Sequence, residues 1–238
     1  MGRIALAGGQ AFATLPAWQD ASRIEVSSER GPVELLDAGR FLVLARHGLS
    51  RYTPPHLIDH PRNLAALREA GCDRLLAICS VGGLRPELGV GTFVCPDDFI
   101  GLARVDAAFD DERGHVVPGF EGDWRRLVLD SWRRTTEIPL VEGGVYWQSP
   151  GPRFETQAEV RLIAAHADVV GMTMASECAT ATQLGLPYAA ICLVDNLANG
   201  VAAAPLTQDE YEAGIAANRE RLTAALGALL PALISEPR

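Results

Sequence analysis

Short apolar segments recur along the chain and are separated by polar or glycine-containing segments. Most of them are apolar throughout instead of alternating between apolar and polar positions, which is typical of strands covered on both faces. The pattern predicts strands over residues 4–7, 41–45, 74–80, 141–148, 168–172 and 188–194.

Helical periodicity and helix-boundary residues predict helices over residues 63–70, 123–134, 156–166, 177–184 and 207–230. Gly71 suits the end of the first helix, and Asp123 is expected to cap the second. Thr207 followed by Glu210 has the spacing of a capping box. Residues 104–122 are polar and contain glycine, so we expect a surface loop there.

The alternation of strands and helices predicts an α/β fold whose sheet carries helices on both faces. The length of 238 residues suits a single domain, which we expect to span residues 1–238. Hydrophobic residues make up 48% of the chain and charged residues 21%, as in an ordinary globular protein. The net charge of −9 argues against nucleic acid or an anionic membrane as the main partner. It still permits a small anion, because a few arginines can reverse the potential inside a pocket.

The chain contains five cysteines, which are Cys72, Cys79, Cys95, Cys178 and Cys192. Their wide spacing and the absence of a CxxC pair give no support for a zinc site or a redox pair, and they predict buried free thiols in a reducing compartment. The N-terminal segment lacks the apolar core of a signal peptide, and no run approaches the ~20 apolar residues of a membrane span. We therefore expect a cytoplasmic protein with no bound metal.

Polar or glycine-rich residues follow five of the predicted strands: Gly8-Gly9, Arg46-His47, Ser80–Gly83, Met172-Thr173 and Asp195-Asn196. Ligands of open α/β sheets bind beyond the carboxyl ends of the strands. These five segments are therefore expected to line one pocket.

Arg46 and His47 can bind an oxyanion, and the guanidinium group offers a planar fork to phosphate. Ser80 adds a hydroxyl, and the glycines at 82 and 83 allow backbone N–H groups to approach an anion. A surface Arg-His pair and an ordinary strand-to-loop turn are the structural alternatives. The chain has no GxxxxGK[ST] motif, so a P-loop is excluded.

The segment GPRFET at 151–156 offers groups that suit a heterocycle. Phe154 provides a flat apolar face, and Glu155 can accept N–H groups from a ring edge. In the later segment GMTMASE, Met172 can pack against a sugar, Thr173 can bond an anion and Glu177 can accept sugar hydroxyls. The structural alternative for each segment is a helix start, with acidic residues favoured by the helix dipole.

The order and type of these motifs resemble the trimeric purine nucleoside and methylthioadenosine phosphorylase family. The matching segments are ARHG at 45–48, NLAAL at 63–67 followed by Gly71-Cys72, SVGGLRPELGVGTFVCPDDFI at 80–100, GPRFETQAE at 151–159, GMTMASE at 171–177 and LVDN at 193–196. The resemblance implies a mixed β-sheet of the nucleoside phosphorylase type, flanked by helices on both faces. It also implies a homotrimer.

The resemblance implies roles for particular residues. The implied phosphate ligands are Gly9, Gln10, Arg46, His47, Ser80 and Thr173, with Cys79 in the same segment. The implied nucleoside contacts are Val81, Gly82, Phe154, Glu155, Met172, Thr173, Asn196 and Ala198. Asn196, Glu155 and His47 are the implied catalytic residues.

The implied reaction is phosphorolysis, in which inorganic phosphate is a co-substrate and no metal or cofactor takes part. Preorganised hydrogen bonds stabilise the charge that develops on the purine. The positioning of phosphate next to the sugar supplies the remaining rate acceleration. Relatives selective for 6-oxopurines pair glutamate with asparagine as Glu155 and Asn196 do here. Inosine, guanosine and methylthioinosine are therefore the expected substrates, with methylthioadenosine as the alternative. A one-residue shift at Asp195 would place an acid where we place the amide.

Two positions depart from the family. The expected GG[ST]G turn reads Gly8-Gly9-Gln10-Ala11, and Arg51 stands where a histidine is usual. Arg51 keeps a donor there, and Gln10 can donate from its amide. These departures leave open a nucleoside hydrolase or a non-catalytic nucleoside-binding protein on the same fold.

The region around Gln208 is expected near the 5′ substituent, and His115 is a candidate contact to a neighbouring subunit.

Overall fold

The structure is a computed structural model that describes residues 2–102, 106–203 and 206–235. Its strands are β1 (Arg3–Gly8), β2 (Ser22–Ser28), β3 (Gly31–Ala38), β4 (Phe41–Ala45), β5 (Cys72–Gly83), β6 (Phe93–Cys95), β7 (Asp98–Ile100), β8 (Leu140–Glu142), β9 (Val145–Gln148), β10 (Val169–Gly171) and β11 (Tyr188–Leu197). Its α-helices are α1 (Gln10–Ala13), α2 (His60–Glu69), α3 (Gly122–Thr135), α4 (Gln157–Ile163), α5 (Met174–Gln183) and α6 (Gln208–Ser235).

All of these strands belong to one mixed sheet. The strands β1, β4, β5 and β11 are parallel neighbours in the order β4-β1-β5-β11, and they are apolar and buried as the sequence predicts. Their shared direction brings four carboxyl ends to the same edge, so the residues that follow them meet there.

The sheet divides at the end of β5. Most of β5 lies between β1 and β11, but Gly82 and Gly83 also pair antiparallel with β10. A Cβ atom at Gly83 would lie 2.4 Å from the Leu88 carbonyl oxygen, so a larger residue would disrupt this crossing. One branch continues from β11 to β6 and β8, and the other continues from β10 to β9 and β7.

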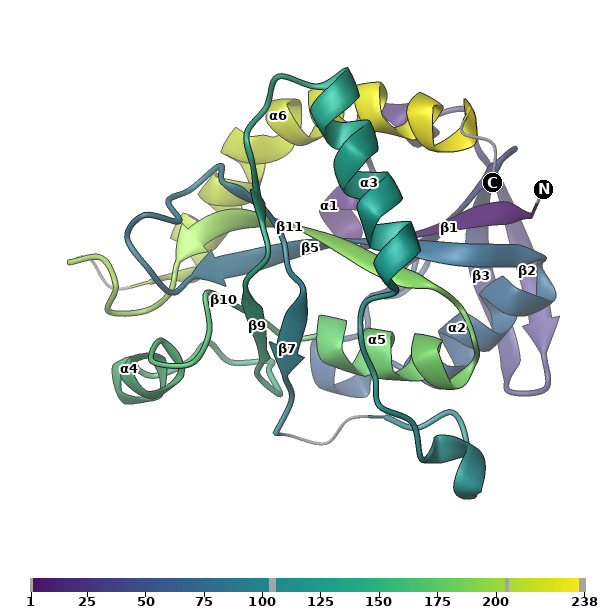
Figure 1. The fold of residues 1–238 in the computed structure, drawn as a ribbon, viewed down its shortest axis with the longest axis horizontal. Coiled ribbons are helices and arrows are strands. Elements are labelled where there is room, and N and C mark those ends of the chain that lie inside the picture. Colours follow the sequence, from purple (N-terminus) through teal and green to yellow (C-terminus); the bar gives the residue numbers. More distant parts are fainter. Residues whose placement is uncertain (1, 103–105, 204–205, 236–238) are drawn as a thin grey trace.

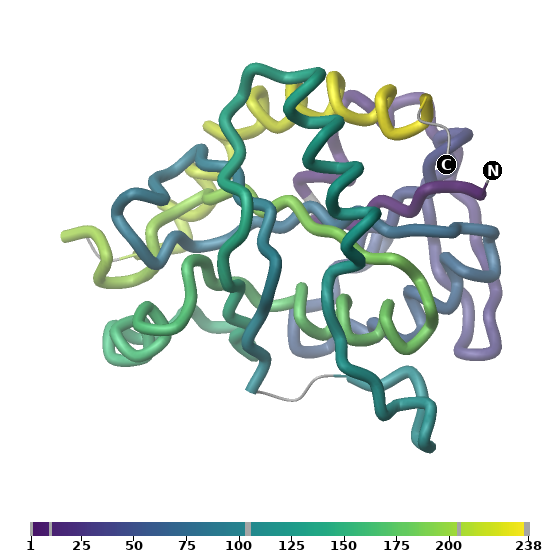
Figure 2. Tube along the Cα trace, viewed as in Figure 1, coloured from purple at the N-terminus to yellow at the C-terminus, as the bar shows by residue number. Residues whose placement is uncertain are grey.

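Helices cover both faces of the sheet, which confirms the predicted fold class (Figure 1). The helices α2 and α5 pack on one face, whereas α1, α3 and α6 pack on the other. Trp124 and Trp132 lie in the second layer and are 4% and 2% exposed, so both are core residues. Figure 2 shows α6 crossing the sheet toward the side on which β1 begins.

Several boundaries differ from the predictions. The helix α3 is capped by Glu121 and not by Asp123, because the Glu121 carboxylate accepts from the N–H groups of Asp123 and Trp124. The segment 141–148 forms two strands, since Gly143 and Gly144 have φ of 97° and 115° and break it.

The hairpin formed by β2 and β3 has no counterpart among the predicted strands. The strand β2 alternates between exposed and half-buried positions, so it lacks the continuous apolar run that marked the buried strands. Described residues of the predicted 104–122 loop are irregular apart from a short 3₁₀ turn at Glu112–Gly114 and Gly122, which begins α3. Positions 104 and 105 lie outside the described residues.

Candidate active site

A cavity of about 600 Å³ lies at the carboxyl ends of the parallel strands and reaches α1 and α6. It brings together Gly9, Arg46, His47, Ser80, Val81, Gly82, Phe154, Glu155, Met172, Thr173, Asn196 and Ala198. Gln10 begins α1 beside it, but its side chain lies outside the described part of the structure. The other predicted ligand positions therefore line one cavity.

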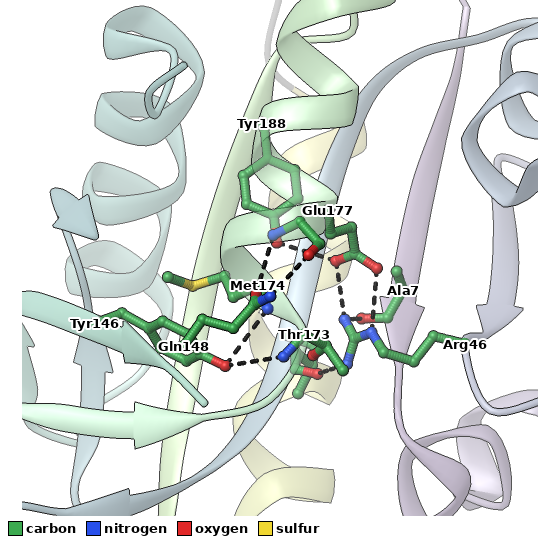
Figure 3. Close-up of polar contacts among 10 residues, drawn as sticks. Ala7, Arg46, Tyr146, Gln148, Thr173, Met174, Glu177 and Tyr188 are labelled. Atoms are coloured by element: carbon green, nitrogen blue, oxygen red, sulfur yellow. Dashed lines mark hydrogen bonds and ion pairs between the residues drawn. The ribbon is translucent and has the colours of Figure 1, made fainter. Parts of the chain in front are cut away.

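Arg46 lies at the base of the cavity in a buried ion pair with Glu177 (Figure 3). Its Nε and Nη2 donate to the two carboxylate oxygens of Glu177 at 3.1 and 3.0 Å. Further donations reach the carbonyl oxygens of Ile78 and Ala7 at 3.0 and 3.1 Å. Four donations of the guanidinium group are thus made within the protein, and they hold the ends of β1, β4 and β5 against α5.

Glu177 is fully buried and accepts a further hydrogen bond of 2.9 Å from the Tyr188 hydroxyl (Figure 3). Burial raises the pKa of this carboxyl group, but the Arg46 charge and hydrogen bonds outweigh burial and hold the pKa below its ordinary value. The proposal that Glu177 accepts sugar hydroxyls is therefore wrong. Its side chain faces inward because the α5 helix begins at Met174, three residues earlier than predicted.

His47 has one fixed ring nitrogen. Its Nδ1 lies 2.9 Å from the Thr53 carbonyl oxygen, and a carbonyl can only accept, so Nδ1 carries the hydrogen. The ring stacks on Tyr52 with centroids 5.5 Å apart. Burial lowers the pKa of His47, which favours the neutral ring with Nε2 as an acceptor.

Thr173 occupies the N-cap position of α5 but makes no side-chain capping bond, so its hydroxyl is not committed to the helix. The Tyr146 hydroxyl takes that place and accepts from the N–H groups of Thr173 and Met174 at 3.2 and 3.4 Å (Figure 3). Gln148 adds a second support, because its amide oxygen accepts from the Ser176 N–H at 2.9 Å.

Glu155 is 8% exposed and lies in the cavity wall. Its Oε1 atom is buried and has no hydrogen-bond partner, which is costly for a carboxylate oxygen unless a ligand supplies a donor. The backbone around it is fixed by the capping box of Thr156 and Glu159 and by the Asn199 amide, which donates to the Glu155 carbonyl at 3.1 Å.

Asn196 is 9% exposed and lies opposite Gly82 on β5. Its Nδ2 donates to the Leu197 carbonyl oxygen at 2.9 Å. Phe154 lines the same part of the cavity and meets Tyr211 edge-on with ring centroids 5.6 Å apart.

The cavity lining also contains polar residues that were not among the predicted ligands, including Tyr52, Asp195, Tyr211 and Asn218. No strand or helix signal marks Tyr52 and Tyr211 as cavity residues, because the tertiary fold brings their segments to the strand ends. Gln208 lines the cavity as expected, and both members of the Asp195-Asn196 pair reach it.

Arg51 is exposed and lies outside the cavity lining, so the expectation that it supplies a donor in place of a family histidine is wrong. The backbone explains its position. Gly48 turns the chain with φ of 89°, and a Cβ atom there would lie 2.2 Å from the Arg51 carbonyl oxygen. His115 is exposed on the loop after its 3₁₀ turn.

The described residues contain no group of three or more His, Cys, Asp or Glu side chains placed to hold a metal ion. In the same residues, no helix has both the length and the apolar character needed to cross a membrane. The five cysteines are free and buried.

The cavity combines an anion-suited end at His47 and Thr173, beside the Arg46–Glu177 pair, with an unpaired carboxylate and an amide at Glu155 and Asn196. Between them lie the apolar surfaces of Met172 and Phe154. This arrangement defines an α/β protein that binds a small ligand with an anionic part and a polar ring edge.

The chain belongs to the phosphorylase superfamily, whose sequence profile matches residues 5–231. This confirms the resemblance drawn from the motifs. A relative from Archaeoglobus fulgidus, named "Probable 6-oxopurine nucleoside phosphorylase", is 34% identical over 83% of this chain and 83% of its own. A relative from Xylella fastidiosa strain Temecula1, named "Probable S-methyl-5'-thioinosine phosphorylase", is 36% identical over 90% of this chain and 92% of its own.

Solved structures show the same fold. A methylthioadenosine phosphorylase from Schistosoma mansoni in complex with adenine superposes with a TM-score of 0.83, covering 100% of this chain and 93% of that one. The sequence identity is 21%, so this likeness concerns the fold.

Proposed function

We propose that this chain catalyses the phosphorolysis of 6-oxopurine nucleosides to the free base and a sugar 1-phosphate. The observation that carries the proposal is the buried, unpaired Oε1 of Glu155 in a cavity that also contains Asn196. The names of the Archaeoglobus and Xylella relatives support the same substrate class.

The ring edge of the substrate explains the preference. Hypoxanthine and guanine carry a hydrogen on N1, and a carboxylate such as that of Glu155 can accept it. Adenine has no hydrogen on N1, so its lone pair would face the carboxylate. A site built to bond a substrate N–H rejects an analogue that lacks it, because the buried polar group stays unpaired. Methylthioadenosine is therefore the less favoured alternative.

Phosphate is proposed to bind between His47, Thr173 and Ser80. The neutral His47 presents Nε2 as an acceptor, which suits the hydroxyl of hydrogen phosphate, while Thr173 offers a hydroxyl donor. Gly9 precedes α1 without a side chain and leaves room for the anion. Arg46 supports this site mainly by holding β4 and α5 together, since Glu177 balances its charge.

In the proposed reaction, a phosphate oxygen attacks the anomeric carbon of the sugar and the bond to the purine nitrogen breaks. The purine takes the electron pair of that bond, and Asn196 stabilises the charge that builds on the ring. The proton of hydrogen phosphate is released as the sugar 1-phosphate forms, and it neutralises the departing base. Met172 packs against the sugar, and Phe154 packs against the base. The proposal requires no metal and no organic cofactor, and inorganic phosphate is the second substrate.

We also propose that the protein is a homotrimer and acts in the cytoplasm. The family resemblance supports the trimer, and large apolar side chains such as Leu57 and Tyr52, which are 63% and 55% exposed near the cavity, are consistent with an interface there. The five buried free thiols support a reducing compartment.

The test is to incubate the purified protein with inosine, guanosine, adenosine, methylthioinosine and methylthioadenosine, each with and without phosphate, and to quantify released base by chromatography. We expect release from at least one 6-oxopurine substrate that depends on phosphate. Release without phosphate would identify a hydrolase. Release from the adenine substrates alone would show that the assignment of Glu155 is wrong, and no release would indicate a binding protein.

A further inference from the structure

The strand β11 contains a bulge where it reaches the cavity. Its pairing with β5 runs in register to Val194 opposite Val81, and the next pair is Asn196 opposite Gly82. Asp195 is therefore an extra residue without a partner on β5. Bulges of this kind change the direction of the following side chain. Here that side chain is Asn196, and a Cβ atom at Gly82 would lie 3.3 Å from its Nδ2.

The helix α6 holds this bulge from the other side. Asn218 lies on α6 and is 5% exposed. Its Nδ2 donates to the Val194 carbonyl oxygen at 3.0 Å and to Asp195 Oδ1 at 2.7 Å. Both hydrogens of one amide group are thus bonded to two consecutive residues of the bulge, which fixes its backbone and its side chain together.

The helix backbone is in direct contact with the same bulge. A Cβ atom at Gly214 would lie only 1.7 Å from the Asp195 carbonyl oxygen, so no larger residue can occupy this position without moving α6. Asp195 is 5% exposed and also hydrogen-bonds Ser80 on the phosphate side of the cavity. Burial raises the pKa of Asp195, and the bonds from Asn218 and Ser80 partly offset this effect.

We infer that Asn218 is a positioning residue, which holds the bulge at Asp195 so that Asn196 presents its amide to the purine ring. The inference rests on the proposed function for the role of Asn196. Asn218 acts through Val194 and Asp195 and is not assigned a contact to the reacting atoms. Removal of its amide takes one donor from the Asp195 carboxylate, which keeps its bond to Ser80, and one from the Val194 carbonyl oxygen, which also accepts from the Gly91 N–H at 2.8 Å. The bulge thereby loses these two bonds to α6.

The test is a double-mutant cycle that combines Asn218→Ala with Asn196→Ala, measured as kcat/KM for inosine at saturating phosphate. We expect Asn218→Ala to lower kcat/KM by about tenfold or more in the wild-type background and by less than about twofold when Asn196 is already alanine. A parallel cycle with His47→Ala is expected to retain the tenfold effect. The KM for phosphate is expected to stay within about twofold of wild type.

Controls separate positioning from folding. Glu220→Ala changes an exposed residue two positions further along α6 and is expected to leave kcat/KM unchanged. If Asn218→Ala does not fold, as judged by circular dichroism, Asn218→Ser takes its place in the cycle. The exchange Asp195→Asn with Asn218→Asp restores one bond between the two side chains with donor and acceptor reversed, and we expect it to recover part of the activity that Asn218→Asp loses.

An equal loss from Asn218→Ala in the wild-type and Asn196→Ala backgrounds would overturn the inference, as would wild-type kinetics in Asn218→Ala. The wild-type protein in the same assay distinguishes a failure of the proposed function from a failure of the role assigned to Asn218. If it releases base from none of the 6-oxopurine nucleosides, the proposed function fails. If it releases base and the cycle is additive, only the role of Asn218 fails.

Discussion

At the scale of single residues, the unpaired oxygen of Glu155 is the most informative atom in the cavity. No protein group donates to this oxygen. It is therefore available to accept an N–H group of a ligand. The sequence shows the glutamate in its motif, but only the structure shows that Arg153 pairs with Glu159 and leaves Glu155 unpaired.

We predict that Glu155→Gln lowers kcat/KM for inosine by about 100-fold, because an amide can no longer offer a charged acceptor to N1–H. Asn196→Asp is expected to shift the ratio of kcat/KM for inosine over adenosine by at least about tenfold toward adenosine, since an acid can accept from the 6-amino group. Steady-state kinetics with both nucleosides measures the two effects.

Glu137→Gln is the matched control, because Glu137 is an exposed glutamate that lies outside both cavity linings. It is expected to leave both rates within about twofold of wild type. An unchanged inosine-to-adenosine ratio in Asn196→Asp would contradict the assignment of the base-binding residues.

At the scale of elements, the first turn of α2 carries a buried histidine. His60 is 2% exposed, and its Nδ1 is buried without a hydrogen-bond partner. Burial lowers the pKa of His60 to about 4, with opposing effects from Glu177 and Arg46 nearby. An unfolded histidine has a pKa of about 6.5, so the unfolded chain binds this proton first as the pH falls.

His60 should therefore make the fold sensitive to acid. The stability that depends on a neutral His60 is present above about pH 6.5 and is lost as the pH falls toward 4, on the order of 3 kcal/mol in total. We predict that His60→Phe reduces the fall in the free energy of unfolding between these pH values, measured by urea unfolding. The variant His56→Phe, at an exposed position four residues earlier, is expected to follow the wild-type curve. Identical pH dependence in the wild type and His60→Phe would contradict the prediction.

Other elements are joined through side chains distant in sequence. Arg46 at the end of β4 bonds Glu177 on α5, and Tyr146 on β9 bonds the first N–H groups of the same helix. These bonds explain why α5 begins at Met174 and why Glu177 faces inward. The motif GMTMASE predicts a helix nearby, but which oxygen caps that helix depends on a tyrosine from another strand.

At the scale of the whole molecule, a second cavity of about 680 Å³ adjoins the first and shares Pro55 and Met172 with it. Leu57 lines this second cavity and is 63% exposed. An exposed apolar side chain of this size beside an open cavity favours a subunit interface that would bury it.

We predict that light scattering gives three times the mass of one chain and that Leu57→Glu lowers this mass toward the monomer, because a charge would be buried in the interface. Leu162→Glu is the matched control, since Leu162 is also 63% exposed but lies on α4 outside both cavity linings. A fully active monomer would contradict the homotrimer, and dissociation by Leu162→Glu alone would place the interface elsewhere.

The sequence by itself determined the buried strands, the class of fold and the segments that carry the chemistry. It could do so because a strand covered on both faces is continuously apolar. In addition, the carboxyl ends of parallel strands meet at one edge of the sheet, and this does not depend on the conformation of the loops. Residues 4–7, 41–45, 74–80 and 188–194 follow this rule and are the centre of the sheet.

The tertiary structure alone decided which polar groups are free to bind a ligand. Glu155 and Glu177 are both acids close to the start of a helix in the sequence, but Glu177 pairs with Arg46 from a strand 131 residues away and Glu155 has no such partner. The bulge at Asp195 likewise depends on Asn218, which α6 brings back across the sheet. Hydrogen-bond partners distant in sequence leave no local pattern, so their effect on each side chain becomes visible only when the chain has folded.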